Sequence, residues 1–127
     1  MTRLALVVDD EPDIRRLLVA DLVAAGYEVI ELDSGERVHA TALEKEPDII
    51  VLDLTMPRVN GYEALRQLNV DPRTTGIPVI VASAKIGKSA QILCRDLGAV
   101  DFLAKPWEDG ELIWRVEQVL GPDPDRA

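Results

Sequence analysis

The chain has 127 residues, of which 47% are hydrophobic and 29% are charged, so we expect one soluble globular domain with its own core. Its net charge of −9 disfavours direct binding to a nucleic-acid backbone. The single Cys94 excludes an internal disulfide, no apolar run is long enough to span a membrane, and the first residues turn acidic too early for a signal peptide. A cytoplasmic protein is therefore predicted.

Apolar runs and amphipathic stretches alternate along the whole chain. The apolar runs predict strands at residues 3–8, 27–32, 48–53, 77–83 and 100–104. Helices are predicted between and after them, at residues 12–25, 34–46, from 60–61 onward, 88–97 and 109–120. Residues 121–127 form a polar tail or the start of a linker, so we expect the domain itself to cover residues 1–120.

This strict alternation predicts an α/β fold with helices on both faces of a parallel sheet. For a chain of this length we expect a doubly wound (βα)5, flavodoxin-like three-layer sandwich with strand order 2-1-3-4-5. The segment 27–32 alternates apolar and polar residues, which is typical of an edge strand. In such sheets the functional site lies beyond the carboxyl ends of the strands, near the first and third strands.

Carboxylates are concentrated at these strand ends. The first predicted strand ends at Asp9 and Asp10, and the third ends at Asp53. Neighbouring strands lie about 4.8 Å apart, so the three acidic side chains are within reach of one another and would repel without a cation. An acid-rich site of oxygen donors suits Mg²⁺. Ser83 ends the fourth strand and Lys105 follows the fifth, where the lysine can meet a phosphoryl group.

The same positions exclude two common nucleotide-binding motifs. A dinucleotide-binding domain needs G-x-G-x-x-G after the first strand, and this chain has D-D-E-P-D there. A phosphate-binding P-loop is also absent from the sequence.

Four segments in this order resemble the response-regulator receiver domains of two-component signalling, including the chemotaxis regulators. They are LVVDDEP, IIVLDLTMPRVNGYE, PVIVASA and GAVDFLAKPW, and the resemblance covers nearly the whole chain. It implies that Asp53 accepts a phosphoryl group from a histidine kinase or phosphotransfer protein. It also implies a magnesium site made by Asp9, Asp10, Asp53 and the main-chain carbonyl of Thr55. The protein would then be a phosphoacceptor switch that assists its own phosphorylation and dephosphorylation, and not an enzyme with a separate substrate.

The resemblance assigns roles to further residues. Lys105 would pair with Asp53 and then with the phosphoryl oxygens, and its bond to Pro106 would be cis. Ser83 would hydrogen-bond the phosphoryl group while Phe102 rotates inward behind it, and the small Ala84 would leave room for that movement. Thr55 and Lys85 occupy the positions that tune the lifetime of the aspartyl phosphate in this family.

Simpler interpretations exist for several of these residues. Asp53 alone is an ordinary surface aspartate at a strand end, and Ser83 alone is a common strand-end hydroxyl. His39, the only histidine, is expected to be a solvated side chain in the second helix, and Cys94 a small core residue. For the whole protein, the alternatives are a constitutive interaction module of receiver shape and a small phosphotransferase or phosphatase.

Helical periodicity separates core positions from exposed ones. The first helix has a mostly apolar stripe of Ile14, Leu17, Leu18, Asp21 and Leu22. The stripe of the fourth helix that is expected to face the core consists of Ala90, Leu93, Cys94 and Leu97. Ile92 and Trp114 lie opposite the core stripes of the fourth and fifth helices. We expect them to mark an output surface on helix 4, strand 5 and helix 5. That surface would serve a downstream protein, an effector domain absent from this sequence, or a phosphorylation-dependent homodimer.

Overall fold

The computed structural model describes residues 2–56, 60–84 and 87–124. Strands and helices alternate in it along the chain, as the sequence predicts. In chain order the elements are β1 Leu4–Val8, α1 Pro12–Ala24, β2 Glu28–Leu32, η1 Gly35–Arg37, α2 Val38–Lys45, β3 Ile49–Leu52, α3 Gly61–Val70, β4 Val79–Ser83, α4 Lys88–Asp96, β5 Asp101–Ala104 and α5 Glu111–Leu120. The second predicted helix is therefore divided into a short 3₁₀ turn and a shorter α-helix.

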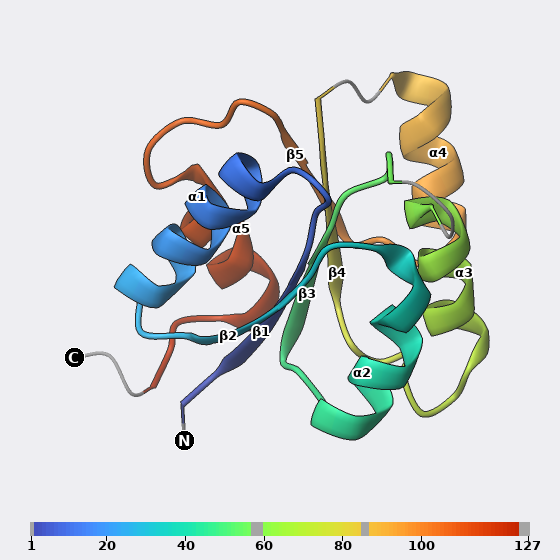
Figure 1. Ribbon diagram of the computed structural model, residues 1–127, viewed down its shortest axis with the longest axis horizontal. Helices are drawn as coiled ribbons and strands as arrows, with labels where there is room; N and C mark the ends of the chain where they lie inside the picture. The colour runs from blue at the N-terminus through green and yellow to red at the C-terminus, as the bar shows by residue number, and fades with distance from the viewer. Residues whose placement is uncertain (1, 57–59, 85–86, 125–127) are drawn as a thin grey trace.

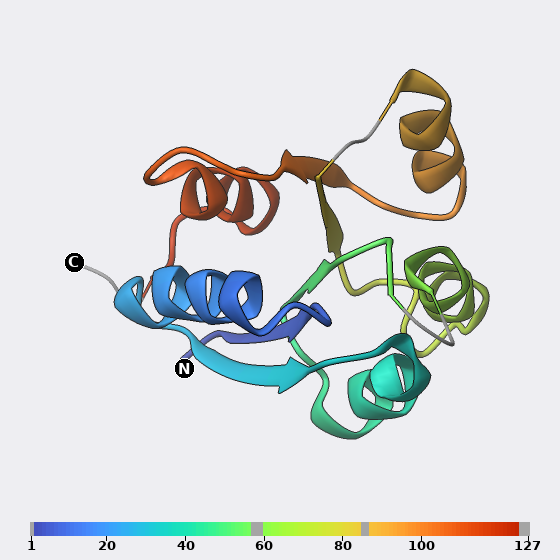
Figure 2. The same cartoon turned by 45° about the horizontal axis from the view of Figure 1, so that its top comes forward.

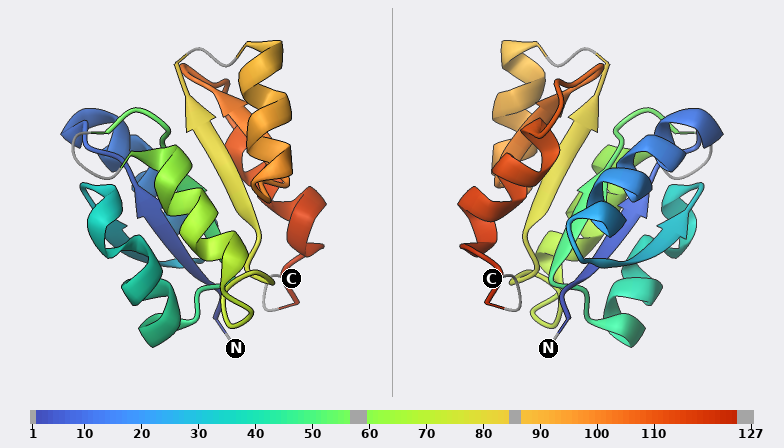
Figure 3. Two further views of the ribbon diagram at one scale, coloured as in Figure 1. Left: turned by 90° about the vertical axis from the view of Figure 1, so that its right-hand side faces the viewer. Right: turned by 90° about the vertical axis from the view of Figure 1, so that its left-hand side faces the viewer.

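The sheet has five parallel strands in the order β2-β1-β3-β4-β5, which confirms the predicted topology. Helices α1 and α5 cover one face of the sheet and α2, α3 and α4 cover the other, so the molecule has three layers (Figures 1 and 2). Figure 3 shows the two helical faces in turn, with both termini at the same end of the molecule. The strand β2 lies at an edge, as its alternating sequence indicates.

Each face of the sheet carries its own hydrophobic core, because successive residues of a strand point to opposite faces. In β1, Leu6 and Val8 join the core under α2, α3 and α4, whereas Ala5 and Val7 join the core under α1 and α5. All four side chains are fully buried. The central strands are therefore held from both sides, which fixes the residues at their carboxyl ends.

Several expectations about single side chains are corrected by the structure. Leu17 and Leu93 were expected on core stripes, but they are 54% and 47% exposed. Both lie at the border of their stripe, where the neighbouring layer no longer covers the helix. Cys94 is fully buried, as predicted, and its burial raises the pKa of the thiol.

His39 is not simply solvated, because its Nε2 lies 2.7 Å from Asp71 Oδ2 in the segment after α3. Arg73 also binds Asp71, with its backbone N–H 2.8 Å from Oδ1. Arg73, and then His39, hold the pKa of Asp71 well below its usual range. The sequence could not reveal this pair, since the partners are far apart along the chain.

The C-terminal end of α5 is attached to the start of β1. The guanidinium of Arg3 donates hydrogen bonds to the carbonyl oxygens of Leu120 at 3.1 Å and Gly121 at 2.8 Å. Asp123, beyond the helix, is buried as well. In the part of the chain that the structure describes, every helix is too short or too polar to cross a membrane.

Candidate functional site

Two buried aspartates stand side by side at the carboxyl ends of the central strands. Val8 of β1 pairs with Leu52 of β3, so the residues that follow them, Asp9 and Asp53, come out at the same level. The backbone N–H of Asp53 donates to the carbonyl of Val8 at 2.9 Å, which continues the ladder by one step. Asp9 is completely buried and Asp53 is 4% exposed. Parallel pairing of two apolar strands therefore brings these carboxylates together.

Asp10 completes a group of three carboxylates with Asp9 and Asp53, whose ligand atoms all lie within 4.8 Å of one another. This is the juxtaposition that the sequence predicts. All donors are carboxylate oxygens, the type that a hard cation such as Mg²⁺ prefers. The donor set thus fits a magnesium ion, with waters or phosphate oxygens to complete its coordination.

Lys105 provides the positive charge next to these acids. Its Nζ lies 2.5 Å from Asp9 Oδ2 and 3.5 Å from Asp53 Oδ1. We expected Asp53 to be its partner, and the structure shows Asp9 as the nearer one. The ammonium group therefore bridges the two buried carboxylates, which are both desolvated and need a compensating charge.

The backbone around Lys105 aims its side chain at the acids. Lys105 follows the end of β5, and its N–H donates to the carbonyl of Ser83 in β4 at 2.9 Å. The Lys105–Pro106 peptide bond is cis, as the resemblance implies. Ser83 is 5% exposed and ends β4 beside the lysine.

An open pocket of about 390 Å³ lies over the carboxylates and the lysine. Its lining residues come from the ends of four strands and the loops that follow them: Asp10, Glu11, Asp53, Thr55, Ser83, Ala84 and Lys105. The N–H of Thr55 donates to Asp53 Oδ1 at 3.3 Å. The pocket therefore gives an incoming group access to Asp53, although most of that side chain is covered.

One carboxylate in this pocket has a strongly altered acidity. The pKa of Asp53 is raised from 3.8 to about 6: burial raises it most, Lys105 lowers it, and the charges of Asp9 and Asp10 also raise it. Removal from water is therefore the main cause, and the lysine does not cancel it. The ionised pocket is therefore a region of excess negative charge that favours a cation.

Gly61 allows the start of α3 to lie close to Asp53. A Cβ atom at this position would overlap the carbonyl oxygen of Asp53 and the Cα of Leu54. Gly61 also begins α3, and the N–H of Gly61 donates to the carbonyl of Leu54 at 2.9 Å. The preceding Asn60 caps the helix, since its Oδ1 accepts the N–H of Glu63 at 3.0 Å. A glycine is required here because backbone packs directly against backbone.

Two further residues support the acidic site: Glu11, which belongs to the acidic end of the first predicted strand, and Arg15, which the sequence analysis did not single out. Glu11 lines the pocket, and its N–H donates to Asp9 Oδ1 at 3.0 Å. Arg15, one turn into α1, donates to the carbonyl of Asp9 at 2.8 Å and to Glu31 Oε1 at 3.1 Å. Glu11 follows the Asp9–Asp10 pair directly, and Arg15 is four residues further on, which is one turn of a helix. Arg15 could have been found from that spacing.

Three further predicted residues, Phe102, Ile92 and Trp114, do not line the pocket. Phe102, on β5, is 8% exposed, and the guanidinium carbon of Arg95 lies 4.9 Å from its ring centroid. Ile92 and Trp114 are 56% and 58% exposed, so neither packs fully on a neighbouring element. Lys85 lies outside the described residues.

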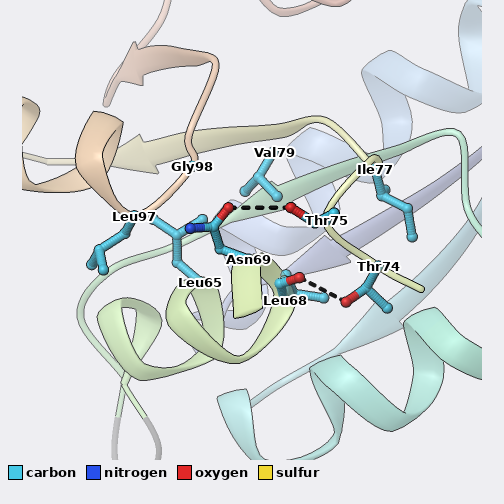
Figure 4. A pocket seen from close by; sticks show the side chains of 9 residues that line it. All are labelled: Leu65, Leu68, Asn69, Thr74, Thr75, Ile77, Val79, Leu97 and Gly98. Carbon is cyan, nitrogen blue, oxygen red and sulfur yellow. Dashed lines mark hydrogen bonds between the residues drawn. The ribbon is translucent and has the colours of Figure 1, made fainter. Parts of the chain in front are cut away.

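A second, much smaller pocket of about 10 Å³ lies between the C-terminal parts of α3 and α4 (Figure 4). Thr75 Oγ1 donates to Asn69 Oδ1 at 3.3 Å, and Thr74 Oγ1 donates to the carbonyl of Leu68 at 2.7 Å. These polar groups satisfy one another and join the α3–β4 connection to α3. The role of this pocket is structural.

The raised pKa of Asp53 makes a prediction for stability in the absence of divalent metal. A carboxyl group whose pKa is higher in the folded state stabilises the fold below its ordinary pKa of 3.8, and this stabilisation is lost as the pH rises through about 6. We therefore expect Asp53→Asn to raise the free energy of unfolding at pH 8 by about 1–2 kcal/mol, and by less at pH 5. Urea unfolding in the presence of EDTA measures both values.

Asp33→Asn is the matched control, because Asp33 is an exposed aspartate at the end of β2. It should leave the unfolding midpoint unchanged at both pH values. An Asp53→Asn protein that is less stable than the parent at pH 8 would contradict the description of Asp53 as a destabilising buried charge.

Comparison with known proteins agrees with this geometry. The response regulator receiver domain family matches residues 5–117. The chain is 37% identical over 125 residues to the phosphate regulon transcriptional regulatory protein PhoB of Pseudomonas aeruginosa, a match that covers 96% of this chain and 55% of that protein. It therefore spans about half the length of this curated relative.

Two solved structures share the whole fold. One is a putative response regulator from Chloroflexus aurantiacus, with a TM-score of 0.89, 33% identity and coverage of 96% of this chain and 100% of that one. The other is the receiver domain of a sensor histidine kinase from Pseudomonas aeruginosa, with a magnesium ion coordinated in its active-site cleft; the TM-score is 0.87, the identity 26%, and the coverage 96% and 100%. The chain therefore belongs to the response regulator receiver domain family, whose members are phosphoacceptor switches of two-component signalling.

Proposed function

We propose that Asp53 accepts a phosphoryl group from a histidine kinase or a phosphotransfer protein. The observation that carries this proposal is the placement of Asp53 beneath an open pocket, next to two further aspartates and Lys105. A carboxylate in that position is accessible to a small group and flanked by the charges that phosphoryl transfer requires. A partner protein would bring the phosphohistidine to the mouth of this pocket.

The acid cluster is also the proposed magnesium site. Asp10 and Asp53 line the pocket, and Asp9 lies directly behind them. Asp10 would be a direct ligand, Asp9 would help directly or through water, and the main-chain carbonyl of Thr55 would complete the protein's ligands. The related kinase receiver domain with magnesium in its cleft supports this assignment. When bound, the ion would offset the negative charge of the carboxylates and of the phosphoryl oxygens.

The reaction needs little from the protein beyond positioning and charge. An oxygen of Asp53 attacks the phosphorus atom, the bond between phosphorus and the donor's imidazole nitrogen breaks, and its electron pair returns to the imidazole. Lys105 Nζ, already 3.5 Å from Asp53 Oδ1, is placed to meet the oxygens of the transferred group. The product is an aspartyl phosphate, which water can hydrolyse.

The proposed switch begins at Ser83. Its hydroxyl would donate to a phosphoryl oxygen on Asp53, and the β4–α4 connection, starting with the small Ala84, would follow. Phe102, which is already buried on β5, would reposition behind it. Thr55 at the pocket mouth would influence the access of hydrolytic water, and the same role is proposed for Lys85.

The first test is Mg²⁺-dependent labelling by acetyl phosphate, followed by intact mass. We expect one phosphoryl group on the parent protein and none on Asp53→Asn. Lys105→Ala should lower the labelling rate by about 100-fold, because a charge that stabilises the transition state is lost. Asp33→Asn, at an exposed strand end, is the control and should be labelled at the parental rate.

The outcomes of this test separate the alternatives. Labelling that persists unchanged in Asp53→Asn would overturn the assignment of the acceptor. Failure of the parent to be labelled, or to respond to beryllium fluoride, would favour a constitutive interaction module of receiver shape. Release of phosphate from added phosphoproteins, with no label on Asp53, would favour a phosphatase.

For output, we propose the face made by α4, β5 and α5. Ile92 and Trp114 are large apolar side chains that are more than half exposed on this face, and Leu93 adds to it at 47%. Exposed large apolar side chains can mark a docking surface. The proposed occupants are a downstream protein, a second copy of the chain, or an effector domain that follows residues 121–127 in a longer protein.

The surface assignment predicts a separation between phosphorylation and output. The double variant Ile92→Ala, Trp114→Ala should be labelled on Asp53 at the parental rate, since neither side chain lines the acidic pocket. Any dimer that beryllium fluoride induces should be weakened at least tenfold, because two exposed apolar anchors are removed. Sedimentation of both proteins with and without beryllium fluoride measures the effect.

Val70→Ala, an exposed apolar residue on α3 at 63% exposure, is the control for general loss of surface hydrophobicity. Dimerisation that survives the double variant would show that a second copy binds another face. A monomer under both conditions would exclude the homodimer as the output and leave the other two occupants.

A further inference from the structure

Asp21 is a carboxylate on the mostly apolar stripe of α1, the stripe that packs towards the sheet. Its neighbours on that stripe, Leu18 and Leu22, are fully buried, and Asp21 itself is half-buried. A half-buried carboxylate among apolar residues is costly unless it accepts a hydrogen bond. Asp21 therefore requires a donor from another part of the chain.

The donor is Trp107, which lies in the connection between β5 and α5. Its indole Nε1 donates to Asp21 Oδ2 at 2.9 Å. The rest of the indole packs against the hydrophobic core under α1 and α5. This contact accounts for the placement of both polar groups, since the half-buried indole N–H and the half-buried carboxylate satisfy each other.

The position of Trp107 connects this contact to the phosphorylation site. Only Pro106 separates Trp107 from Lys105, and a proline has a fixed φ angle and little freedom. Helix α1, which carries Asp21, begins at Pro12, shortly after Asp9, and Asp9 is an ion-pair partner of Lys105. The Asp21–Trp107 bond thus joins the segment that carries the lysine to the helix that follows the aspartates.

Other contacts of this connection do not replace the bond. Within the described residues, the Asp21–Trp107 bond is the one hydrogen bond between residues 106–110 and α1. The N–H of Glu108 donates to Glu111 Oε1 at 3.3 Å, and not to α1. Beside it lies an open groove of about 160 Å³, bordered by Leu17 and Pro106. Part of the space between α1 and the connection is therefore unfilled, so the packing of the connection on α1 is incomplete.

We propose that Asp21 and Trp107 are positioning residues for Lys105, which fasten the β5–α5 connection to α1 and so hold the ammonium group over Asp9 and Asp53. The inference rests on the proposed function for its consequence in phosphoryl transfer. The position of Lys105 itself is independent of that function. Loss of the bond would let residues 105–107 move away from α1, and the lysine would spend less time at the carboxylates.

The test combines two measurements on the same variants: Asp21→Ala, Trp107→Phe and Asp21→Asn. Hydrogen exchange of the Lys105 amide, which donates to the Ser83 carbonyl, is followed by NMR in metal-free protein relative to the Val51 amide in β3. Labelling by acetyl phosphate and Mg²⁺ is followed by intact mass. Val23→Ala, an exposed substitution on the same helix, is the control.

We expect Asp21→Ala and Trp107→Phe to raise Lys105 exchange by about tenfold and to lower the labelling rate by a similar factor. Asp21→Asn keeps an acceptor oxygen, so its Lys105 exchange rate and its labelling rate should both stay close to those of the parent. A purely electrostatic role of Asp21 would not allow this result. Unchanged Lys105 exchange in both variants overturns the proposal, and so does faster exchange with parental labelling. If the parent is not labelled at all, the proposed function fails, and the exchange measurement alone decides whether Lys105 is positioned by this bond.

Discussion

Three carboxylates and one lysine share the carboxyl end of a parallel sheet. The excess negative charge there is the constraint that the rest of the site must satisfy. Asp9 and Asp53 are almost entirely removed from water, so their charges cannot be screened by solvent. Lys105 approaches both, but one ammonium group cannot neutralise three acids. Burial is the largest cause of the raised pKa of Asp53, and the charges of Asp9 and Asp10 add to it. In the proposed function, the missing positive charge is supplied by Mg²⁺ and the excess negative charge becomes a means of binding it.

The fold provides the stability that this arrangement costs. The strands that end at the acids are apolar on both faces, and all their residues except Leu4 are buried, so their ends cannot move apart to relieve the repulsion. The start of α3 is equally constrained, because the backbone of Gly61 packs against the backbone of Asp53. Stability is thus concentrated in the two cores, while the crowded buried carboxylates of the pocket cost stability.

Much of the site was predictable from sequence because it depends on topology alone. Strict alternation of apolar runs and helices dictates a parallel sheet, and the strand order places Asp9, Asp10 and Asp53 at one edge. Distances between side chains were not predictable in the same way. Lys105 lies closer to Asp9 than to Asp53, and topology alone does not determine which of two adjacent carboxylates a lysine approaches more closely.

Pairs between distant segments were also missed. His39 binds Asp71, and Asp21 binds Trp107, yet each pair combines residues of different helices and loops whose contact needs the finished fold. The polar residue within an apolar stripe was the one available signal for Asp21. Leu93 was placed in the core by periodicity, and its exposure shows that periodicity gives the direction of a side chain but not how far the neighbouring layer extends.

The most direct measurement of the central claim is the effect of Mg²⁺ on the free energy of unfolding at pH 8. A cation that relieves the carboxylate repulsion must stabilise the parent protein, by about 1.4 kcal/mol when its concentration is tenfold above its dissociation constant. The gain should be much smaller in Asp10→Asn and Asp53→Asn, which have fewer charges in the pocket. An equal gain in all three proteins, or none in the parent, would contradict the account.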